Sequence, residues 1–418
     1  MRKIGAIMAM VVLLAPLVLP RVSAQQEINV FYQMTPGEDA IFRKILQQTG
    51  KDLNIKVKPI NMDTIDTMNK VSAEVRAGGK GSVNVIFTDV TYVGMWYKSG
   101  TYLDLTSRFN DWKDKPDIFE LILDAGIIED KIVALPLRTD CEVLYYNEEM
   151  FNKYSVPTPD TWESWDDFYS AAKTFKEKTG TPRFGMKGNL YEGLTCDFLS
   201  YVWAAGGRVA DPQGNVYFNS PETIEALNFL RKLRDEGLIH RNSRIWKEGS
   251  IVEEGMIGNQ IYMAMDWPYA MSMLQGAGRT QWKVALTPPG PKTRATALGW
   301  WYFVIPKSAP NLDITWEFVK HMLGDKMQLL MNEKLGWAMA NKNAWQVDES
   351  WPQWQKDLVN TQREMLNKYA MPRPKIARWT EVSYAIQMCF DRVIYRGEDI
   401  AQIVERTARE IQKIIEGR

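Results

Sequence analysis

Residues 134–165 of the chain read ALPLRTDCEVLYYNEEMFNKYSVPTPDTWESW. In this stretch an apolar run, LPL, meets the opposite charges of Arg138 and Asp140, and a second β-prone run, EVLYY, follows them. A strand that changes character at a polar kink suits a crossing between two lobes, with its polar side chains facing a cleft. We therefore predict a two-lobed chain that passes from one lobe to the other at this point.

The N-terminal part of the chain alternates between strand and helix patterns. The β-prone runs cover residues 27–32, 54–60 and 83–87, and the helical patterns between them cover residues 41–46 and 64–76. Strand, helix, strand, helix, strand is typical of a parallel sheet with helices on its faces. Asp89 follows the third strand, and open α/β sheets bind ligands at the carboxyl ends of their strands.

Three further helices are predicted in the rest of the chain. Ser164 and Asp167 fit a capping box at the start of one helix, and apolar stripes indicate two others over residues 221–236 and 400–415. We find no internal repeat, low-complexity tract or Pro/Ser-rich linker. Two lobes without a linker imply that the chain crosses between them more than once.

The first residues have the pattern of a secretory signal peptide. Arg2 and Lys3 precede an apolar run over residues 4–19, and Val22-Ser23-Ala24 supplies small residues at the usual cleavage distance. We expect cleavage after Ala24, which removes 24 of the 418 residues and leaves 394. A mature chain of this length predicts two domains. We expect a soluble protein in the periplasm or outside the cell.

The composition excludes several classes of partner. The chain has 51 basic and 51 acidic residues with no basic block, so we expect no nucleic-acid partner. His240 and His321 are its only histidines, so we expect no histidine metal site and no cofactor. The three cysteines fit one disulfide plus a free thiol, or three buried thiols, and the sequence does not choose.

The segment YYNEEMF and the helix start PDTWESW, taken in this order, resemble the extracellular solute-binding proteins of carbohydrate ABC importers. The resemblance extends over residues 27–416 and is strongest to the trehalose/maltose type of disaccharide binder. It implies a periplasmic-binding-protein-like α/β fold with two lobes, each a mainly parallel sheet flanked by helices, joined by several hinge crossings. The implied lobes are residues 25–138 with 285–325, and residues 139–284 with 326–418. It also implies a monomer that captures a di- or oligosaccharide and delivers it to permease subunits in the membrane.

Aromatic residues are the first group of candidate ligand contacts. Fourteen of the sixteen tryptophans follow residue 160, and an indole ring suits the apolar face of a sugar. The resemblance points to Trp267 and Tyr269 after a β-prone run, to Gly299-Trp300 at a strand start, and to Trp337 at a helix end. Glycine at 299 would let the backbone approach the ligand. Each tryptophan could equally be an ordinary core residue.

Polar residues form the second group, because carboxylates and guanidinium groups suit the hydroxyl rim of a sugar. The candidates are Asp89, Arg138, Asp140, Glu38, Arg373 and Tyr191. Arg138 and Asp140 would also make sense as an ion pair that stiffens the hinge, and Glu38 as a helix N-terminal carboxylate. Arg373 lies in a Pro-Arg-Pro motif, and inter-lobe bonding is an alternative role for it.

Two other classes of function are open to a chain of this composition. Paired carboxylates and tryptophans also occur in glycan hydrolases, and Glu253-Glu254 and Asp166-Asp167 are acidic pairs. The first pair fits a solvated surface, and the second fits the start of a helix. An exported module that binds polysaccharide on its surface would be smaller and richer in strands than this chain. A binding protein is therefore the leading hypothesis.

Overall fold

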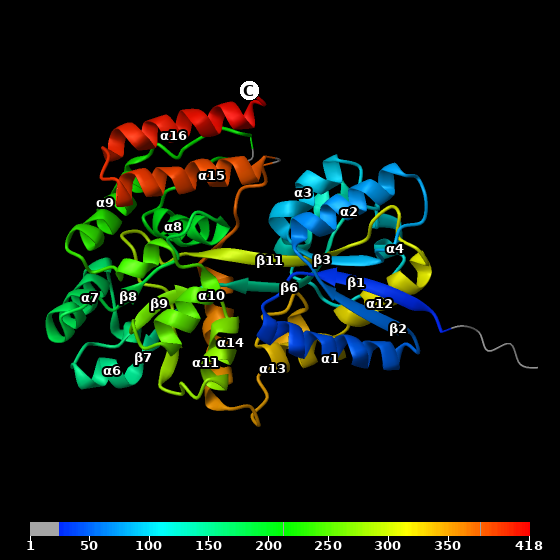
Figure 1. Cartoon of the computed structure of the whole chain (residues 1–418), viewed down its shortest axis with the longest axis horizontal. Coiled ribbons are helices and arrows are strands. Elements are labelled where there is room, and N and C mark those ends of the chain that lie inside the picture. Colours follow the sequence, from blue (N-terminus) through cyan, green and yellow to red (C-terminus); the bar gives the residue numbers. More distant parts are fainter. Residues whose placement is uncertain (1–24, 212, 377) are drawn as a thin grey trace, which may run out of the picture.

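The computed structural model describes residues 25–211, 213–376 and 378–418, and these residues form two lobes side by side (Figure 1). The predicted signal peptide, residues 1–24, lies outside the described residues. None of the helices that are described has the length and apolar character needed to span a membrane.

The first lobe contains the predicted strand–helix alternation. Its sheet has the order β12-β11-β3-β1-β2, with β6 also paired to β11, and β1 is parallel to both β2 and β3. The strands are β1 (Glu27–Tyr32), β2 (Lys56–Asn61), β3 (Val85–Asp89), β6 (Leu135–Cys141), β11 (Thr296–Val304) and β12 (Ala370–Met371). The parallel β1–β3 core confirms the expected α/β arrangement.

Helices cover both faces of this sheet. One face packs against α1, α12 and α13, and the other packs against α2, α3 and α5. The helices of this lobe are α1 (Pro36–Asp52), α2 (Thr64–Arg76), α3 (Val90–Lys98), α4 (Thr106–Asn110), α5 (Glu120–Ala125), α12 (Leu312–Leu323) and α13 (Asp325–Leu335). A two-stranded ribbon, β4 (Ile127–Ile128) with β5 (Lys131–Ile132), follows α5.

Helix α13 lies beyond the boundary that was predicted at residue 325, and yet it packs into the first lobe. Met327, Met331 and Leu335 are fully or almost fully buried in the same core as the strands β1 and β3. The segment that follows α13, as far as Ala344, belongs to this core too. The apolar side chains that decide this placement face residues about 300 positions away in the sequence, so no local pattern reveals it.

The second lobe has a smaller sheet with the order β10-β7-β9-β8. Its strands are β7 (Val143–Asn147), β8 (Phe184–Gly185), β9 (Met263–Asp266) and β10 (Trp282–Ala285). The expectation of a mainly parallel sheet is wrong here, because β7 is antiparallel to both β9 and β10 and only β8 and β9 are parallel. Strand β7 enters the lobe from the crossing, whereas its two neighbours run back towards it.

Helices surround the second sheet. They are α6 (Glu148–Lys153), α7 (Trp165–Thr179), α8 (Glu192–Ala204), α9 (Pro221–Asp235), α10 (Glu248–Ser250), α11 (Tyr269–Gly276), α14 (Gln353–Lys368), α15 (Trp379–Phe390) and α16 (Ile400–Ile415). Short helical segments of this lobe are η1 (Pro159–Thr161), η2 (Arg241–Arg244), η3 (Ile251–Ile257) and η5 (Asp391–Tyr395), whereas η4 (Lys342–Trp345) ends the segment that packs in the first lobe. The predicted capping box of Ser164 and Asp167 opens α7, and the predicted helices over 221–236 and 400–415 are α9 and α16.

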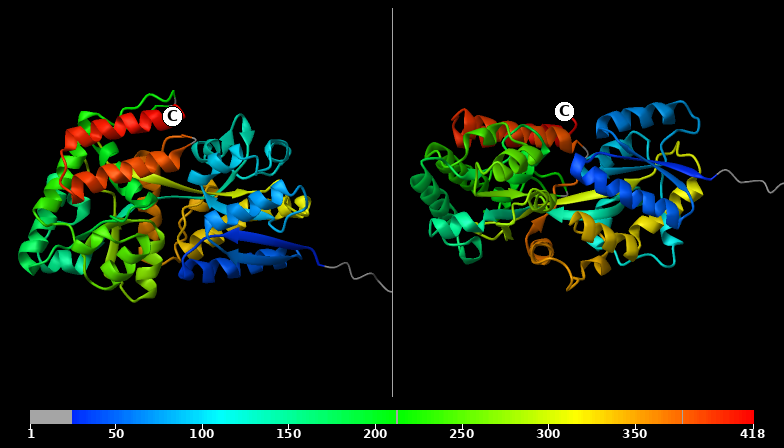
Figure 2. Two further views of the ribbon diagram at one scale, coloured as in Figure 1. Left: turned by 45° about the horizontal axis from the view of Figure 1, so that its top comes forward. Right: turned by 60° about the horizontal axis from the view of Figure 1, so that its bottom comes forward.

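Two neighbouring strands connect the lobes. β6 and β11 run side by side between them, as Figure 1 and both views of Figure 2 show. They are antiparallel, with Asp140 opposite Gly299 and Arg138 opposite Trp301. The predicted crossing within residues 134–165 is therefore confirmed, and the polar residues of LPLRTD lie at its centre.

The cysteines are not paired with one another. Cys141, Cys196 and Cys389 are buried free thiols. Of the two arrangements that the sequence left open, the structure has three buried thiols.

Candidate ligand-binding site

Gly299 lies at the centre of a group of predicted site residues. A Cβ atom at this position would lie 1.9 Å from Oδ1 of Asp140 and 2.8 Å from Cζ3 of Trp267. Asp140 lies on a crossing strand, whereas Trp267 follows β9 in the second lobe. Only glycine allows the backbone to approach a carboxylate and an indole ring this closely.

We expect Gly299→Val to disrupt this arrangement. Its side chain would overlap Asp140 and Trp267, and overpacking of this kind costs about 1–3 kcal/mol of stability. The melting temperature should fall by several degrees, and any ligand that contacts Trp267 should bind more weakly. Gly276→Ala is the matched control, because nothing lies within 4 Å of a Cβ atom there. Equal melting temperatures for the two variants would contradict the packing described here.

Asp140 is almost fully buried, with 4% of its surface exposed. The pKa of its carboxyl is raised to about 6, mainly by burial; Arg138 lowers it, and the negative charges of Asp89 and Glu38 add to the rise. Nε of Arg138 lies 3.4 Å from Oδ2 of Asp140. The predicted ion pair therefore forms. The negative charges of the surrounding carboxylates outnumber the positive charge of the Arg138 guanidinium group.

Arg138 also connects two candidates from the first lobe. Its Nη1 donates to Oε1 of Glu38 at 3.4 Å, and Nε1 of Trp337 donates to the same oxygen at 3.1 Å. The guanidinium carbon lies 4.3 Å from the ring centroid of Trp337 and 5.0 Å from that of Trp301. Trp337 is 1% exposed, so its indole belongs to the core and orients Glu38 through its N–H.

Trp267 is held by residues of the second lobe. Its Nε1 donates to Oε1 of Glu248 at 3.0 Å, and the backbone N–H of Glu248 donates to Oη of Tyr191 at 3.0 Å. The ring is half-buried. Tyr269 is 8% exposed, its hydroxyl has no partner among the described residues, and burial raises its pKa well above the usual value.

Arg373 joins the two lobes. Its Nη1 donates to Oε1 of Glu192 on α8 at 2.9 Å, and its Nη2 lies 3.8 Å from Oδ2 of Asp89 at the end of β3. Nη2 also donates to the carbonyl oxygen of Leu298 on β11 at 3.4 Å. This position supports the inter-lobe role that the sequence left open.

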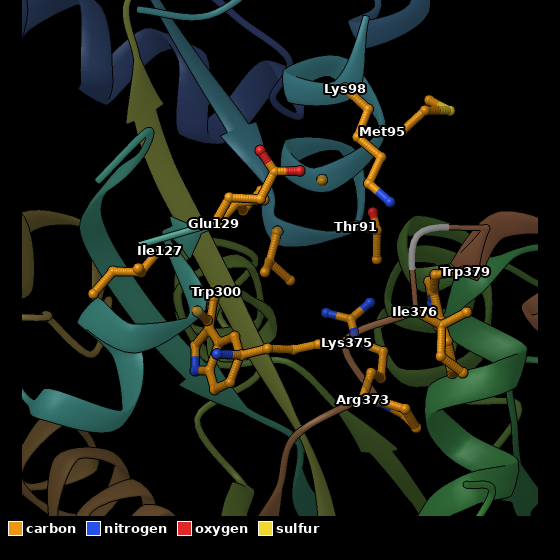
Figure 3. Close-up of a pocket in the computed structure, with 15 residues that line it drawn as sticks. Thr91, Met95, Lys98, Ile127, Glu129, Trp300, Arg373, Lys375, Ile376 and Trp379 are labelled. Atoms are coloured by element: carbon orange, nitrogen blue, oxygen red, sulfur yellow. The ribbon is translucent and has the colours of Figure 1, made fainter. Parts of the chain in front are cut away.

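Trp300 points away from the group around Gly299. It packs with Leu298 and Tyr302 on the opposite face of β11, where it is 3% exposed. There it lines a cavity of about 370 Å³ together with Arg373 and Trp379, as Figure 3 shows. Trp301, one position later, lies on the face that carries Arg138. Side chains alternate along a strand, so Trp300 and Trp301 lie on opposite faces of β11, and the predicted ligand contact of Trp300 stays a prediction.

The cavity has walls of mixed character, with apolar side chains such as Val90 and Ile127 beside the charged Lys98, Glu129 and Lys375. The group around Gly299 consists of carboxylates, a guanidinium group and indole rings that both lobes contribute. A ligand with an apolar face and a rim of hydroxyls matches the chemistry of this group.

The family model for the bacterial extracellular solute-binding proteins matches residues 41–359 of the chain. The chain belongs to this family. Members are binding proteins and not enzymes, so the alternative of a glycan hydrolase is not retained. Consistent with this, Glu254 of the first acidic pair accepts a hydrogen bond from Trp246, and Asp167 of the second caps α7.

Similar proteins agree with this family assignment. A probable ABC transporter-binding protein of Deinococcus radiodurans is 26% identical over 313 residues, which cover 71% of this chain and 70% of that protein. Maltose-bound MalE3 of T. maritima is 23% identical with a TM-score of 0.79, covering 93% of this chain and 99% of that one. The GacH receptor of Streptomyces glaucescens is 20% identical with a TM-score of 0.80, covering 94% and 99%. The structural likenesses confirm the two-lobed solute-binding fold.

Several residues of this solute-binding protein that contact the candidates were not predicted. Glu248 accepts a hydrogen bond from Trp267 and Glu192 accepts one from Arg373, and neither glutamate belongs to a recognisable motif. Trp301 was not among the predicted ligand contacts, whereas its neighbour Trp300 was. No sequence motif marked Lys187, which lies behind Trp267.

Proposed function

We propose that this solute-binding protein captures a sugar, a di- or oligosaccharide, between its lobes and delivers it to the permease subunits of an ABC importer. The observation that carries the proposal is the meeting of Asp140, Gly299 and Trp267 at the crossing strands. The sugar would stack on Trp267, and the carboxylates of Asp140, Glu38 and Asp89 would accept hydrogen bonds from its hydroxyl groups. Several relatives with known structures were solved with maltose, acarbose or cycloalternan bound, which supports a saccharide here too.

Closure of the two lobes would complete the site. Arg373 contacts Asp89 of the first lobe and Glu192 of the second, so it would stabilise a closed arrangement. A ligand drives closure only if it contacts the closed form better than the open form. We place the lobe boundaries at 138–139 and 284–285 as the sequence indicated, and the last one after Ala344, because the segment as far as that residue packs in the first lobe.

We further propose that the protein acts as a monomer in the periplasm or outside the cell, after removal of residues 1–24, with no nucleic acid or cofactor. The balance of 51 acidic and 51 basic residues supports the absence of a nucleic-acid partner. Among the described residues, no group of three or more His, Cys, Asp or Glu side chains is arranged to hold a metal ion.

The test is thermal unfolding of the purified exported protein with mono- and disaccharides, sugar phosphates, polyamines and amino acids. Tryptophan emission would be recorded in parallel, and chromatography would show whether each ligand stays intact. We expect a neutral di- or oligosaccharide to raise the melting temperature, since a ligand at 100 times its Kd adds about 2.7 kcal/mol of stability. A rise with amino acids or polyamines alone would overturn the proposal.

A further inference from the structure

Lys187 lies in a fully buried group of carboxylates behind Trp267. Its Nζ is 2.6 Å from Oε1 of Glu142, 2.8 Å from Oδ1 of Asp197 and 3.9 Å from Oδ1 of Asp266. None of these four side chains is more than 1% exposed. The residues come from four separate parts of the chain, so the fold has assembled the group.

The charges in this group do not balance. Three carboxyls face one ammonium, and a buried net charge is costly unless a group changes its protonation state. Oε2 of Glu142 and Oδ2 of Asp266 have no hydrogen-bond partner among the described residues. Burial raises the pKa values of both carboxyls, and Lys187 only partly offsets it. The group therefore holds a proton at neutral pH.

Trp267 donates hydrogen bonds to Asp266, a member of this group, and to the nearby Glu248. Its backbone N–H donates to Oδ1 of Asp266 at 2.7 Å, and its indole N–H donates to Glu248 at 3.0 Å. Nζ of Lys187 lies 5.9 Å from the centroid of the indole ring. The position of Trp267 thus depends on carboxyls whose ionisation Lys187 influences.

We propose that Asp266, Lys187 and Glu248 are positioning residues that hold Trp267 in its binding orientation, and that ligand affinity depends on a proton bound by Asp266. The statement about affinity rests on the proposed function, whereas the statement about Trp267 does not. The charged and titratable groups that face Asp266 are Lys187, Glu142, Asp197, Glu248, Tyr145, Tyr191 and Tyr269.

The direction of the pH dependence follows from the geometry. Burial raises the pKa of Asp266 to about 8, with Lys187 opposing and Glu248 adding to the rise. If Trp267 leaves its position, water reaches Asp266 and its pKa falls towards the ordinary value of about 4. The positioned form then binds more protons, so it is favoured below pH 8 and is lost as the pH rises through this value. Affinity should fall between pH 7 and pH 9 by at most about tenfold, because it follows the fraction of the free protein in which Trp267 is positioned.

The first experiment uses the protein without ligand. The indole N–H resonance of Trp267, assigned with Trp267→Phe, is followed by NMR between pH 6 and pH 9.5. We expect it to shift with a midpoint somewhat below pH 8, because displacement of Trp267 favours the ionised form of Asp266. Asp266→Asn should abolish the shift because an amide does not titrate while its oxygen still accepts the backbone N–H. A flat resonance, or the same titration in Asp266→Asn, would overturn the inference.

The second experiment is calorimetric titration with maltose at pH 7, 8 and 9. The wild type should lose affinity as the pH rises, by at most about tenfold, with proton uptake on binding, and Asp266→Asn should show no change with pH. Asp313→Asn is the control for an exposed carboxylate, and it should lose as much affinity as the wild type because its side chain is 92% exposed in the first lobe. A pH-independent Kd in the wild type would refute the coupling. If maltose and other sugars do not bind, the proposed function fails, and the indole titration still decides the role of Asp266.

Discussion

Replacing Lys187 by methionine should lower the free energy of unfolding by about 3–5 kcal/mol at pH 8, as removal of one partner of a buried ion pair does. Without the ammonium, Glu142, Asp197 and Asp266 would lie together in the core with no positive charge within 4 Å. Methionine fills nearly the same volume, so lost packing contributes little. Urea unfolding at pH 8 and at pH 5.5 measures the effect.

The loss should be smaller at pH 5.5 than at pH 8. In the folded state burial raises the pKa values of Glu142 and Asp266 above those in the unfolded state, and without Lys187 nothing in the group opposes this rise. Stability is therefore fully present below the unfolded pKa of about 4 and is lost as the pH rises through the folded values. Lys326→Met is the matched control: its ammonium is 73% exposed, and exposed pairs are worth about 0–1 kcal/mol. A Lys187→Met protein as stable as that control at pH 8 would show that the buried pairs do not form.

The elements of the first lobe could be predicted from the sequence because their signals are local. Alternating strand and helix patterns mark β1 to β3, and the polar interruption of LPLRTD marks the crossing strand β6. The direction of β7 in the second sheet and the lobe to which α13 belongs depend on partners far away in the chain. Local patterns carry no information about those partners. The second sheet was therefore expected to be mainly parallel, and α13 was expected in the second lobe.

The choice between Trp300 and Trp301 shows the same limit within the site. Both residues precede the apolar run YFVIP, and an alternating pattern does not say which of two adjacent tryptophans faces the ligand. The register of β11 against β6 places Trp301 opposite Arg138, on the face where Asp140 and Trp267 approach Gly299. Lys187, Glu192 and Glu248 were missed for a related reason, because each acts on a candidate residue through contacts that only the fold creates.

Trp267→Ala should weaken ligand binding by on the order of 2 kcal/mol or more, as the loss of a large aromatic anchor commonly does. The ring is half-buried beside Gly299 and Asp140, and its N–H donates to Glu248. The ring is therefore already oriented, and ligand binding does not have to order it.

Trp267→Phe separates the two contributions of this residue, because it keeps an aromatic face and loses the hydrogen bond to Glu248. Its loss of affinity should be smaller than that of Trp267→Ala, and Trp351→Ala, a half-buried tryptophan after η4, should bind as the wild type does. Calorimetric titration of all three with the sugar that stabilises the wild type compares them directly. Unchanged affinity of Trp267→Ala would remove Trp267 from the site. Equal losses in the alanine and phenylalanine variants would mean that the hydrogen bond from the indole N–H to Glu248 accounts for the whole effect and that the aromatic face adds nothing to affinity.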